Sequence, residues 1–306
     1  MLSYRHAFHA GNHADILKHT VLINILESLN LKDKPYTVFD SHAGSGIYSL
    51  QDERSKKTGE AALGIIPLLK EMNSIDFPQS LSNYFKICEL YQKHDLYPGS
   101  VEFEKIFTDK SCAHTVMELN NSEIDLLKEN ASRETLVSLS RDRSQVKTQV
   151  RHADGLKDIL ALSPPNIKRG LCLIDPSYEE ADEYEKTGNA VINLNKKWNV
   201  AVIALWYPLL AHRIIDIESM KKNIIASVKS RNDKTEIMDA QFLVNKADSH
   251  TETSLKENSG PPRLYGSGML VINMPWKLDE KTSENLKYIA SKIYKEESTS
   301  WDVKVF

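Results

Sequence analysis

The residues best suited to chemistry follow a short apolar run over residues 170–174. The run ends in Asp175, Pro176, Ser177 and Tyr178. Ligands of open α/β sheets bind beyond the carboxyl ends of the strands, so Asp175 is expected to project into a cleft and to accept a hydrogen bond from an exocyclic amine. The Tyr178 ring offers a stacking face for an extruded base, and the Pro176 carbonyl is a second acceptor on a fixed turn. The pattern indicates a site that methylates the amine of a base.

Taken alone, Asp175 has a simpler interpretation as the N-cap of a helix that begins in the acidic stretch 179–185. The end of a second predicted strand favours the catalytic interpretation of Asp175 over the N-cap interpretation. Residues 36–46 read YTVFDSHAGSG, which is an apolar strand that ends in an acid and then a Gly-x-Gly turn. Glycines there let the backbone approach a ligand closely. Because Ser49 stands where the dinucleotide fingerprint has its third glycine, and the phosphate-binding Gly-Lys-Ser/Thr is missing, a nucleoside without phosphates fits better.

Two further acidic residues follow predicted strands. Glu118 comes after residues 114–117, and Asp154, followed by Gly155, comes after residues 146–153. We expect Glu118 on ribose hydroxyls, since two vicinal hydroxyls match the acceptors of one carboxylate. These positions are typical of an S-adenosylmethionine pocket, in which one acid binds the ribose, another lies near the adenine and a third lies in the transfer site.

The order and wording of these motifs resemble the 23S ribosomal RNA adenine-N6-methyltransferases of the large-subunit methyltransferase J type. The resemblance covers nearly the whole chain and is densest over residues 1–20, which read MLSYRHAFHAGNHADILKHT. It continues through His42-Ala43-Gly44, Tyr97-Pro98-Gly99-Ser100, Glu118-Leu119, Ala153-Asp154-Gly155, Asp175 to Tyr178, Leu205-Trp206-Tyr207-Pro208 and Gly268 to Asn273. It implies methyl transfer from S-adenosylmethionine to the N6 amine of a specific adenosine in 23S ribosomal RNA, with S-adenosylhomocysteine as the product.

The resemblance also implies roles for single residues. Asp175, Tyr178, Lys18 and His6 would be catalytic, and Tyr4 and Pro176 would contact the substrate nucleotide. The cofactor pocket would be lined by Lys18, His19, His42, Ser100, Glu118, Asp154, Gly155 and Asp175. On the residues alone, His19 reads as a buried helix histidine and Ser100 as a helix cap. The chain departs from the family at Ser177, where a second proline would stiffen the turn.

The predicted elements alternate along the chain. Strands are expected at 36–40, 114–118, 146–152, 170–174, 199–206, 235–244 and 268–274. Helices are expected at 14–30, 61–72, 79–93, 99–108, 120–130, 155–162, 179–197, 209–229 and 279–294. This alternation predicts an α/β, Rossmann-like, seven-stranded methyltransferase fold, with the last two strands as an antiparallel edge hairpin. We assign residues 1–50 and 97–306 to the methyltransferase domain and residues 51–96 to an inserted helical subdomain over the cleft, with a dimer contact as the alternative.

Composition limits the location and the partners. Three scattered cysteines suit a reducing cytoplasm, and the chain has no apolar segment of membrane-spanning length. No metal is expected, because His6, His9 and His13 lack partners at zinc spacing. The net charge of −3 is compatible with RNA binding through a local basic patch. The best candidates are the basic, histidine-rich N-terminal segment and the loop from Arg54 to Lys57, both expected to flank the cleft.

Three functions from different classes stay open on the sequence. The first is the ribosomal RNA methyltransferase, acting on 23S RNA that is free or in an early assembly intermediate, with no obligate protein partner. The second is a DNA adenine-N6-methyltransferase or a protein of external-DNA utilisation, since Asp-Pro-Pro-Tyr motifs also serve DNA enzymes. The third is a nucleic-acid binder that has lost turnover through Ser177. A separate target-reading domain would favour DNA, and the sequence indicates none.

Overall fold

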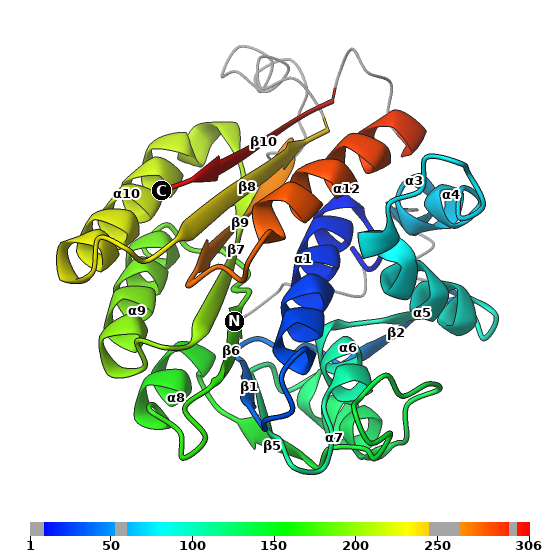
Figure 1. The fold of residues 1–306 in the computed structure, drawn as a ribbon, viewed down its shortest axis with the longest axis horizontal. Helices are drawn as coiled ribbons and strands as arrows, with labels where there is room; N and C mark the ends of the chain where they lie inside the picture. Colours follow the sequence, from blue (N-terminus) through cyan, green and yellow to red (C-terminus); the bar gives the residue numbers. More distant parts are fainter. Residues whose placement is uncertain (1–8, 53–59, 245–263, 294–298) are drawn as a thin grey trace.

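The computed structural model describes residues 9–52, 60–244, 264–293 and 299–306 (Figure 1). These residues form a large eight-stranded sheet, in which the strands lie in the order β10-β8-β9-β7-β6-β1-β4-β5. Its strands are β1 (Thr37–Asp40), β4 (Ala113–Glu118), β5 (Thr148–His152), β6 (Gly170–Ile174), β7 (Val202–Leu209), β8 (Ile237–Leu243), β9 (Gly266–Ile272) and β10 (Ser300–Val305).

The sheet is parallel over its central part. β1 pairs in parallel with β4 and β6, β4 with β5, and β6 with β7. β9 lies antiparallel between β7 and β8, and β10 adds antiparallel to β8. All seven predicted strands form, and the predicted α/β fold class is confirmed. The eighth strand, β10, was not predicted, and it places the β8–β9 hairpin inside the sheet rather than at its edge.

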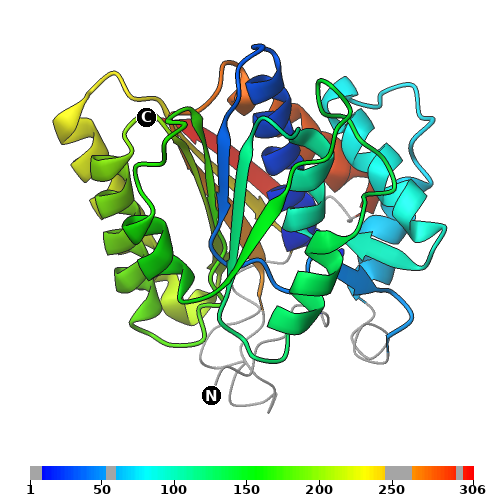
Figure 2. The same ribbon diagram turned by 90° about the horizontal axis from the view of Figure 1, so that it is seen from below.

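Helices cover both faces of the sheet, as the view from below shows (Figure 2). One layer contains α1, α6 and α12, and the opposite layer contains α8, α9 and α10. Asn12 begins α1, because its side chain accepts hydrogen bonds from the amides of Ala14 and Asp15 at 2.9 and 3.0 Å. The helices of the two layers are α1 (His13–Asn30), α6 (Ser100–Phe107), α8 (Gly155–Ala161), α9 (Glu183–Lys197), α10 (Ile214–Arg231) and α12 (Leu278–Ile293).

The two faces of the sheet can be followed along β6 and β7. In β6, Leu171 and Leu173 pack with the α1 layer, whereas Cys172 and Ile174 pack with the α9 layer. Successive side chains of a strand point to opposite faces, and β6 is apolar on both because it is buried on both. The residue after β6, Asp175, therefore falls on the α1 side of the sheet.

The described part of the segment 51–96, which is residues 51–52 and 60–96, is largely helical. It contains α3 (Glu60–Leu63), α4 (Ile65–Leu69), η2 (Gln79–Leu81) and α5 (Ser82–Gln92), and a small sheet of β2 (Ile47–Ser49) and β3 (Leu96–Pro98) closes the segment at its base. Its apolar side chains share one core cluster with α1. None of the described residues between 60 and 96 lines the pocket described below. The division into two domains stays a prediction. Two further helices are α7 (Ile124–Ser132), which follows β4, and the short η3 (Ala211–Arg213), which follows β7.

Candidate active site

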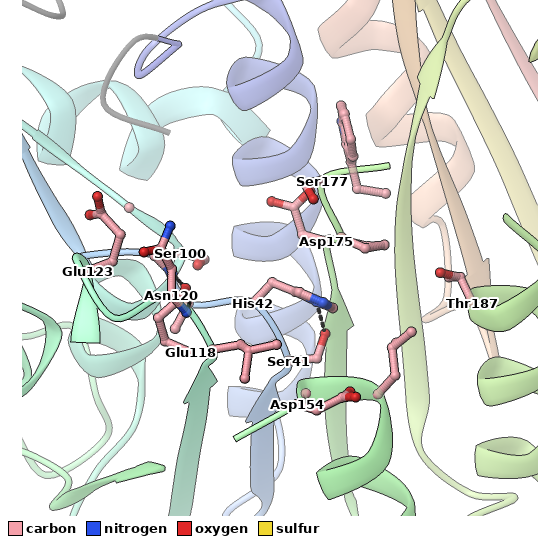
Figure 3. A pocket seen from close by; sticks show the side chains of 18 of the residues that line it. Ser41, His42, Ser100, Glu118, Asn120, Glu123, Asp154, Asp175, Ser177 and Thr187 are labelled. Atoms are coloured by element: carbon pink, nitrogen blue, oxygen red, sulfur yellow. Dashed lines mark hydrogen bonds between the residues drawn. The ribbon is translucent and has the colours of Figure 1, made fainter. Parts of the chain in front are cut away.

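A pocket opens at the carboxyl ends of the parallel strands, where the sequence predicted chemistry. It is lined by residues that follow β1, β4, β5 and β6, together with Lys18 and His19 of α1 and Trp206 of β7. Figure 3 shows Glu118 and Glu123 on one side of it, Asp175 and Thr187 on the other, and His42 between them. Nine predicted site residues line this pocket: Lys18, His19, His42, Ser100, Glu118, Asp154, Gly155, Asp175 and Pro176.

Asp175 is held from the neighbouring helix. The ammonium group of Lys18 lies 2.6 Å from Asp175 Oδ2 and 3.0 Å from Asp15 Oδ1, and the Lys18 side chain is almost fully buried. A buried cation is stable only when it is paired, so the two carboxylates fix the position of Lys18 and Lys18 fixes Asp175. A carboxylate can accept more hydrogen bonds than this one, so Asp175 can still accept from an amine.

Two glycines of the pocket stand where the surrounding protein leaves no room for a side chain. Gly44 has φ of +57°, and an added Cβ would lie 2.1 Å from the hydroxyl oxygen of Tyr48. A Cβ on Gly155 would lie 1.8 Å from the carbonyl oxygen of Ser41, because the start of α8 touches the loop after β1. Both positions therefore require glycine, and the backbone lines the pocket there.

The acids after β4 and β5 hold the surrounding loops. Glu118 accepts hydrogen bonds from the amides of Gly44 at 2.8 Å and Asn120 at 2.6 Å, and burial raises the pKa of its carboxyl group. Asp154 is the N-cap of α8, where it accepts from the amide of Lys157 at 3.2 Å. Burial opposes ionisation of Asp154, but the hydrogen bonds and charge of Lys157 lower its pKa overall. Glu118 thus fixes the glycine turn after β1, and Asp154 fixes the start of α8, and both of these segments line the pocket.

Buried polar side chains set the shape of the pocket floor. Ser100 donates a hydrogen bond of 2.5 Å to Asp40, which ends β1 and also accepts from the amide of His42 at 3.0 Å. Burial lowers the pKa of His42 to about 4, although Asp175 and Asp154 favour its charged form, so its imidazole is neutral at pH 7. The ring of His19 is buried and its Nδ1 lies 2.8 Å from the Tyr97 hydroxyl.

Tyr178 lies elsewhere than the sequence predicted. Its side chain is only 6% exposed, and it packs against Tyr184 in the α9 layer instead of lining the pocket. Its hydroxyl donates to the carbonyl of Trp206 at 3.1 Å, and its φ is +53°, which is rare for an aromatic residue. In this structure Tyr178 supports the pocket wall and offers no exposed stacking face. The predicted site residues Tyr4 and His6, and the basic loop 54–57, lie outside the described residues.

Several pocket residues were missed by the sequence analysis. Asn120 and Glu123 follow Glu118, while Glu183 and Thr187 belong to α9, and Trp206 belongs to β7. Helix residues that face a pocket carry no local signature, because their spacing equals that of a core-facing helix. Trp206 did have a signal, since it stands near the end of a predicted strand next to the one that carries Asp175.

The whole chain was compared with known proteins. Residues 33–305 match the family described as "Ribosomal RNA large subunit methyltransferase D, RlmJ". The proteins named ribosomal RNA large subunit methyltransferase J from Escherichia coli K12 and Haemophilus influenzae Rd are each 32% identical to this chain; the first alignment covers 96% of this chain and 94% of the relative, and the second covers 99% and 98%.

A solved structure has the same fold over nearly its full length. The crystal structure of a protein from Legionella pneumophila Philadelphia 1 superimposes with a TM-score of 0.76 at 25% identity, covering 97% of this chain and 98% of that one. In the part of the chain that the structure describes, no helix is long and apolar enough to cross a membrane, and no group of three or more His, Cys, Asp and Glu side chains could hold a metal ion. By the match over residues 33–305 and by its relatives, the chain belongs to the ribosomal RNA large subunit methyltransferase family RlmJ.

Proposed function

We propose that this chain transfers a methyl group from S-adenosylmethionine to the exocyclic N6 amine of an adenosine in 23S ribosomal RNA. The observation that carries the proposal is the carboxylate of Asp175, held by Lys18 at the end of β6 in a pocket between two glycine-lined loops. The names of the relatives, which are ribosomal RNA large subunit methyltransferases, support the substrate class.

The residues present fit the proposed cofactor. Gly44 and Gly155 line the pocket with close-packed main chain, and Glu118 and Asp154 stand at the ends of neighbouring strands. Glu118 would bind the ribose hydroxyls, and Asp154 would lie near the adenine. Bound S-adenosylmethionine would supply an electrophilic methyl group on its sulfonium. Lys18, His19, His42 and Ser100 would complete the cofactor side of the pocket.

Asp175 and the Pro176 carbonyl would prepare the amine for attack. The N6 lone pair is delocalised into the adenine ring, and hydrogen bonds from N6 to these two acceptors favour a pyramidal nitrogen with an exposed lone pair. On transfer the methyl group would leave sulfur with its bonding pair staying behind, and N6 would become acidic. Asp175 would accept the proton that N6 then loses and pass it to water, so it need not be a strong base. Catalysis consists mainly of positioning and electrostatics.

Transfer of a labelled methyl group tests the proposal. Protein-free 23S RNA, duplex DNA and single-stranded DNA are incubated with the enzyme and labelled S-adenosylmethionine, and the product nucleoside is identified by mass spectrometry. We expect N6-methyladenosine in the RNA alone. Faster labelling of either DNA would replace this function by a DNA adenine methyltransferase. Binding of 23S RNA without any labelling would leave a nucleic-acid binder. Comparing free RNA with assembly intermediates would define the form of 23S RNA that is used.

A further inference from the structure

Trp206 is the pocket residue with the clearest unassigned role. It lies in β7, whose register with β6 pairs Ile174 with Leu205, so that Asp175 and Trp206 are the next neighbours along the two strands. Adjacent strands lie roughly 4.8 Å apart, and residues in register on parallel strands point to the same face. Trp206 is therefore beside Asp175 at the edge of the sheet where the proposed chemistry occurs.

The packing of β7 supports this placement. Val202 and Ala204 of β7 pack with the α1 layer, whereas Ile203 and Leu205 pack with the α9 layer. By the same alternation Trp206 starts from the α1 face, on which Lys18 reaches Asp175, and its large ring packs against the apolar clusters of both layers. The side chain of Trp206 also lines the pocket, so it is available to a ligand that contacts Asp175.

The indole nitrogen of Trp206 has an unmet hydrogen bond. Its Nε1 is buried, and no described residue accepts a hydrogen bond from it. An indole N–H can only donate, and a buried donor without a partner costs free energy, which is why such groups are rare in folded proteins. By contrast, Nε1 of the buried Trp198 donates to the carbonyl of Lys168. Because the Trp206 side chain lines the pocket, a ligand acceptor would satisfy Nε1 once the ring turns or the atoms that cover Nε1 move aside.

We propose that Trp206 determines which base is accepted, by donating from Nε1 to a ring nitrogen next to the amine that Asp175 binds. The inference rests on the proposed function. In adenine the N6 amine is flanked by N1 and N7, both of which are acceptors. A donor at Trp206 and an acceptor at Asp175 therefore match adenine at two adjacent points. Guanine has a carbonyl oxygen in place of the amine. This oxygen and the Asp175 carboxylate are both acceptors, so they would repel each other.

Tyr178 gives this recognition site its rigidity. Its hydroxyl donates to the main-chain carbonyl of Trp206, and the two ring centroids lie 6.2 Å apart. The turn that carries Asp175 and Pro176 is thus tied to β7 by the tyrosine at its end. Tyr178 acts here as a positioning residue for both Asp175 and Trp206.

The test combines Trp206→Phe, which removes the donor and keeps a ring, with atom-deleted substrates. Once mass spectrometry has located the methylated adenosine, synthetic RNAs carry adenosine, 7-deazaadenosine or 1-deazaadenosine at that position. We expect the wild type to lose about tenfold in kcat/KM with one of the two analogues, the size of one hydrogen bond. Trp206→Phe should be about tenfold slower on adenosine and show no further loss with that analogue. Trp276→Phe, which changes an indole that is 80% exposed and outside the pocket, is the matched control.

The outcomes separate this inference from the function on which it rests. Base recognition by Trp206 would be refuted if Trp206→Phe lowered kcat/KM by the same factor, relative to the wild type, on all three RNAs. It would also be refuted if Trp206→Phe left the rate on adenosine unchanged. Methyl transfer by the wild type would stand in either case. A wild type that methylates no RNA would overturn both. Calorimetric affinity for S-adenosylhomocysteine should be the same in the wild type and Trp206→Phe. A drop there would mean that Trp206 shapes the cofactor side of the pocket, which contradicts its assignment to the base.

Discussion

The pair formed by Lys18 and Asp175 explains how one carboxylate is aimed in a largely buried site. Lys18 is 6% exposed, and it is shared between Asp175 and Asp15 of its own helix. Removing Lys18 would leave two largely buried carboxylates without their cation, which is far more costly than losing a surface ion pair, whereas removing Asp175 would leave Lys18 paired with Asp15. The ion pairs of Lys18 therefore hold the Asp175 side chain in place and balance the charges around it.

Replacing Asp175 by asparagine tests its role in transfer. Asp175→Asn keeps the size of the side chain and removes the charge, so we expect methyl transfer to fall by about 100-fold or more, within the range for proton-transfer groups. Affinity for S-adenosylhomocysteine should fall by less than about tenfold, because the interaction is used mainly in the transition state. Labelled-methyl kinetics and calorimetry measure the two quantities. Glu180→Gln, in the exposed turn beyond Asp175, is the control.

Near-normal turnover by a folded Asp175→Asn enzyme would move the chemistry to another residue. Thermal unfolding of the variant provides the check on folding.

Glu118 should act on cofactor affinity rather than on the transfer step. Glu118→Ala removes an acceptor for the ribose hydroxyls and also the bonds to the amides of Gly44 and Asn120. We expect binding of S-adenosylhomocysteine to weaken by about 1.5 to 3 kcal/mol, as for hydrogen bonds to a charged group. Calorimetry measures this, with the exposed Glu134→Ala as control. Unchanged affinity would remove Glu118 from the cofactor site.

At the scale of elements, the contact between α8 and the loop after β1 closes the pocket. Gly155→Ala would place a methyl group 1.8 Å from the Ser41 carbonyl, so α8 or the loop must move. We expect a loss of about 1 to 3 kcal/mol in stability, as for overpacked sites, together with weaker cofactor binding. Denaturant unfolding and calorimetry test both.

Gly188→Ala in α9 is the matched control for Gly155→Ala. Its nearest contact would be the flexible side chain of Met220 at 3.2 Å, with the Met220 Cα at an ordinary 4.0 Å, and alanine is the better helix former. The control should be neutral or slightly stabilising. Equal effects of both substitutions would show that the contact with Ser41 is not the cause.

The strand that carries Asp175 could be predicted because β6, a central parallel strand buried on both faces, reads as a continuous apolar run that ends at an acid. β5 before Asp154 is an edge strand with the mixed sequence TQVRH, so its prediction depended on its place in the alternation of strands and helices. β10 could not be predicted, since its exposed residues and alternating pattern SWDVKV gain a partner only when β8 is already in place. The same holds for Tyr178, whose burial depends on Tyr184 and Trp206. Sequence placed the acids at the right strand ends, but it could not show which aromatic side chain enters the pocket.

At the scale of the whole molecule, His42 links the pocket to the pH dependence of stability. Its folded pKa of about 4 lies below the usual 6.5, because burial disfavours the charged form. Between these values the unfolded chain binds a proton that the folded chain does not, so the stability contributed by the neutral ring is lost as pH falls from 6.5 toward 4.

His42→Asn isolates this contribution from that of the other titrating groups. We expect the free energy of unfolding of the wild type, relative to the variant, to fall by up to about 2.5 kcal/mol between pH 7 and pH 4.5. Denaturant unfolding at a series of pH values measures the difference. A difference that does not change with pH would mean that His42 is protonated equally in both states.

The order of elements along the chain has a consequence for synthesis on the ribosome. α1 is made before any strand of the large sheet, and fourteen of its eighteen residues are buried in the finished protein. β1 must then wait for β6, since Thr37 pairs with Gly170, and at ~5–20 residues per second this takes roughly 7 to 27 s. α5 emerges much earlier and touches α1, where Asn83 donates to Glu27 at 2.7 Å. We therefore expect the segment 60–92 to cover part of α1 in the nascent chain before the sheet is complete.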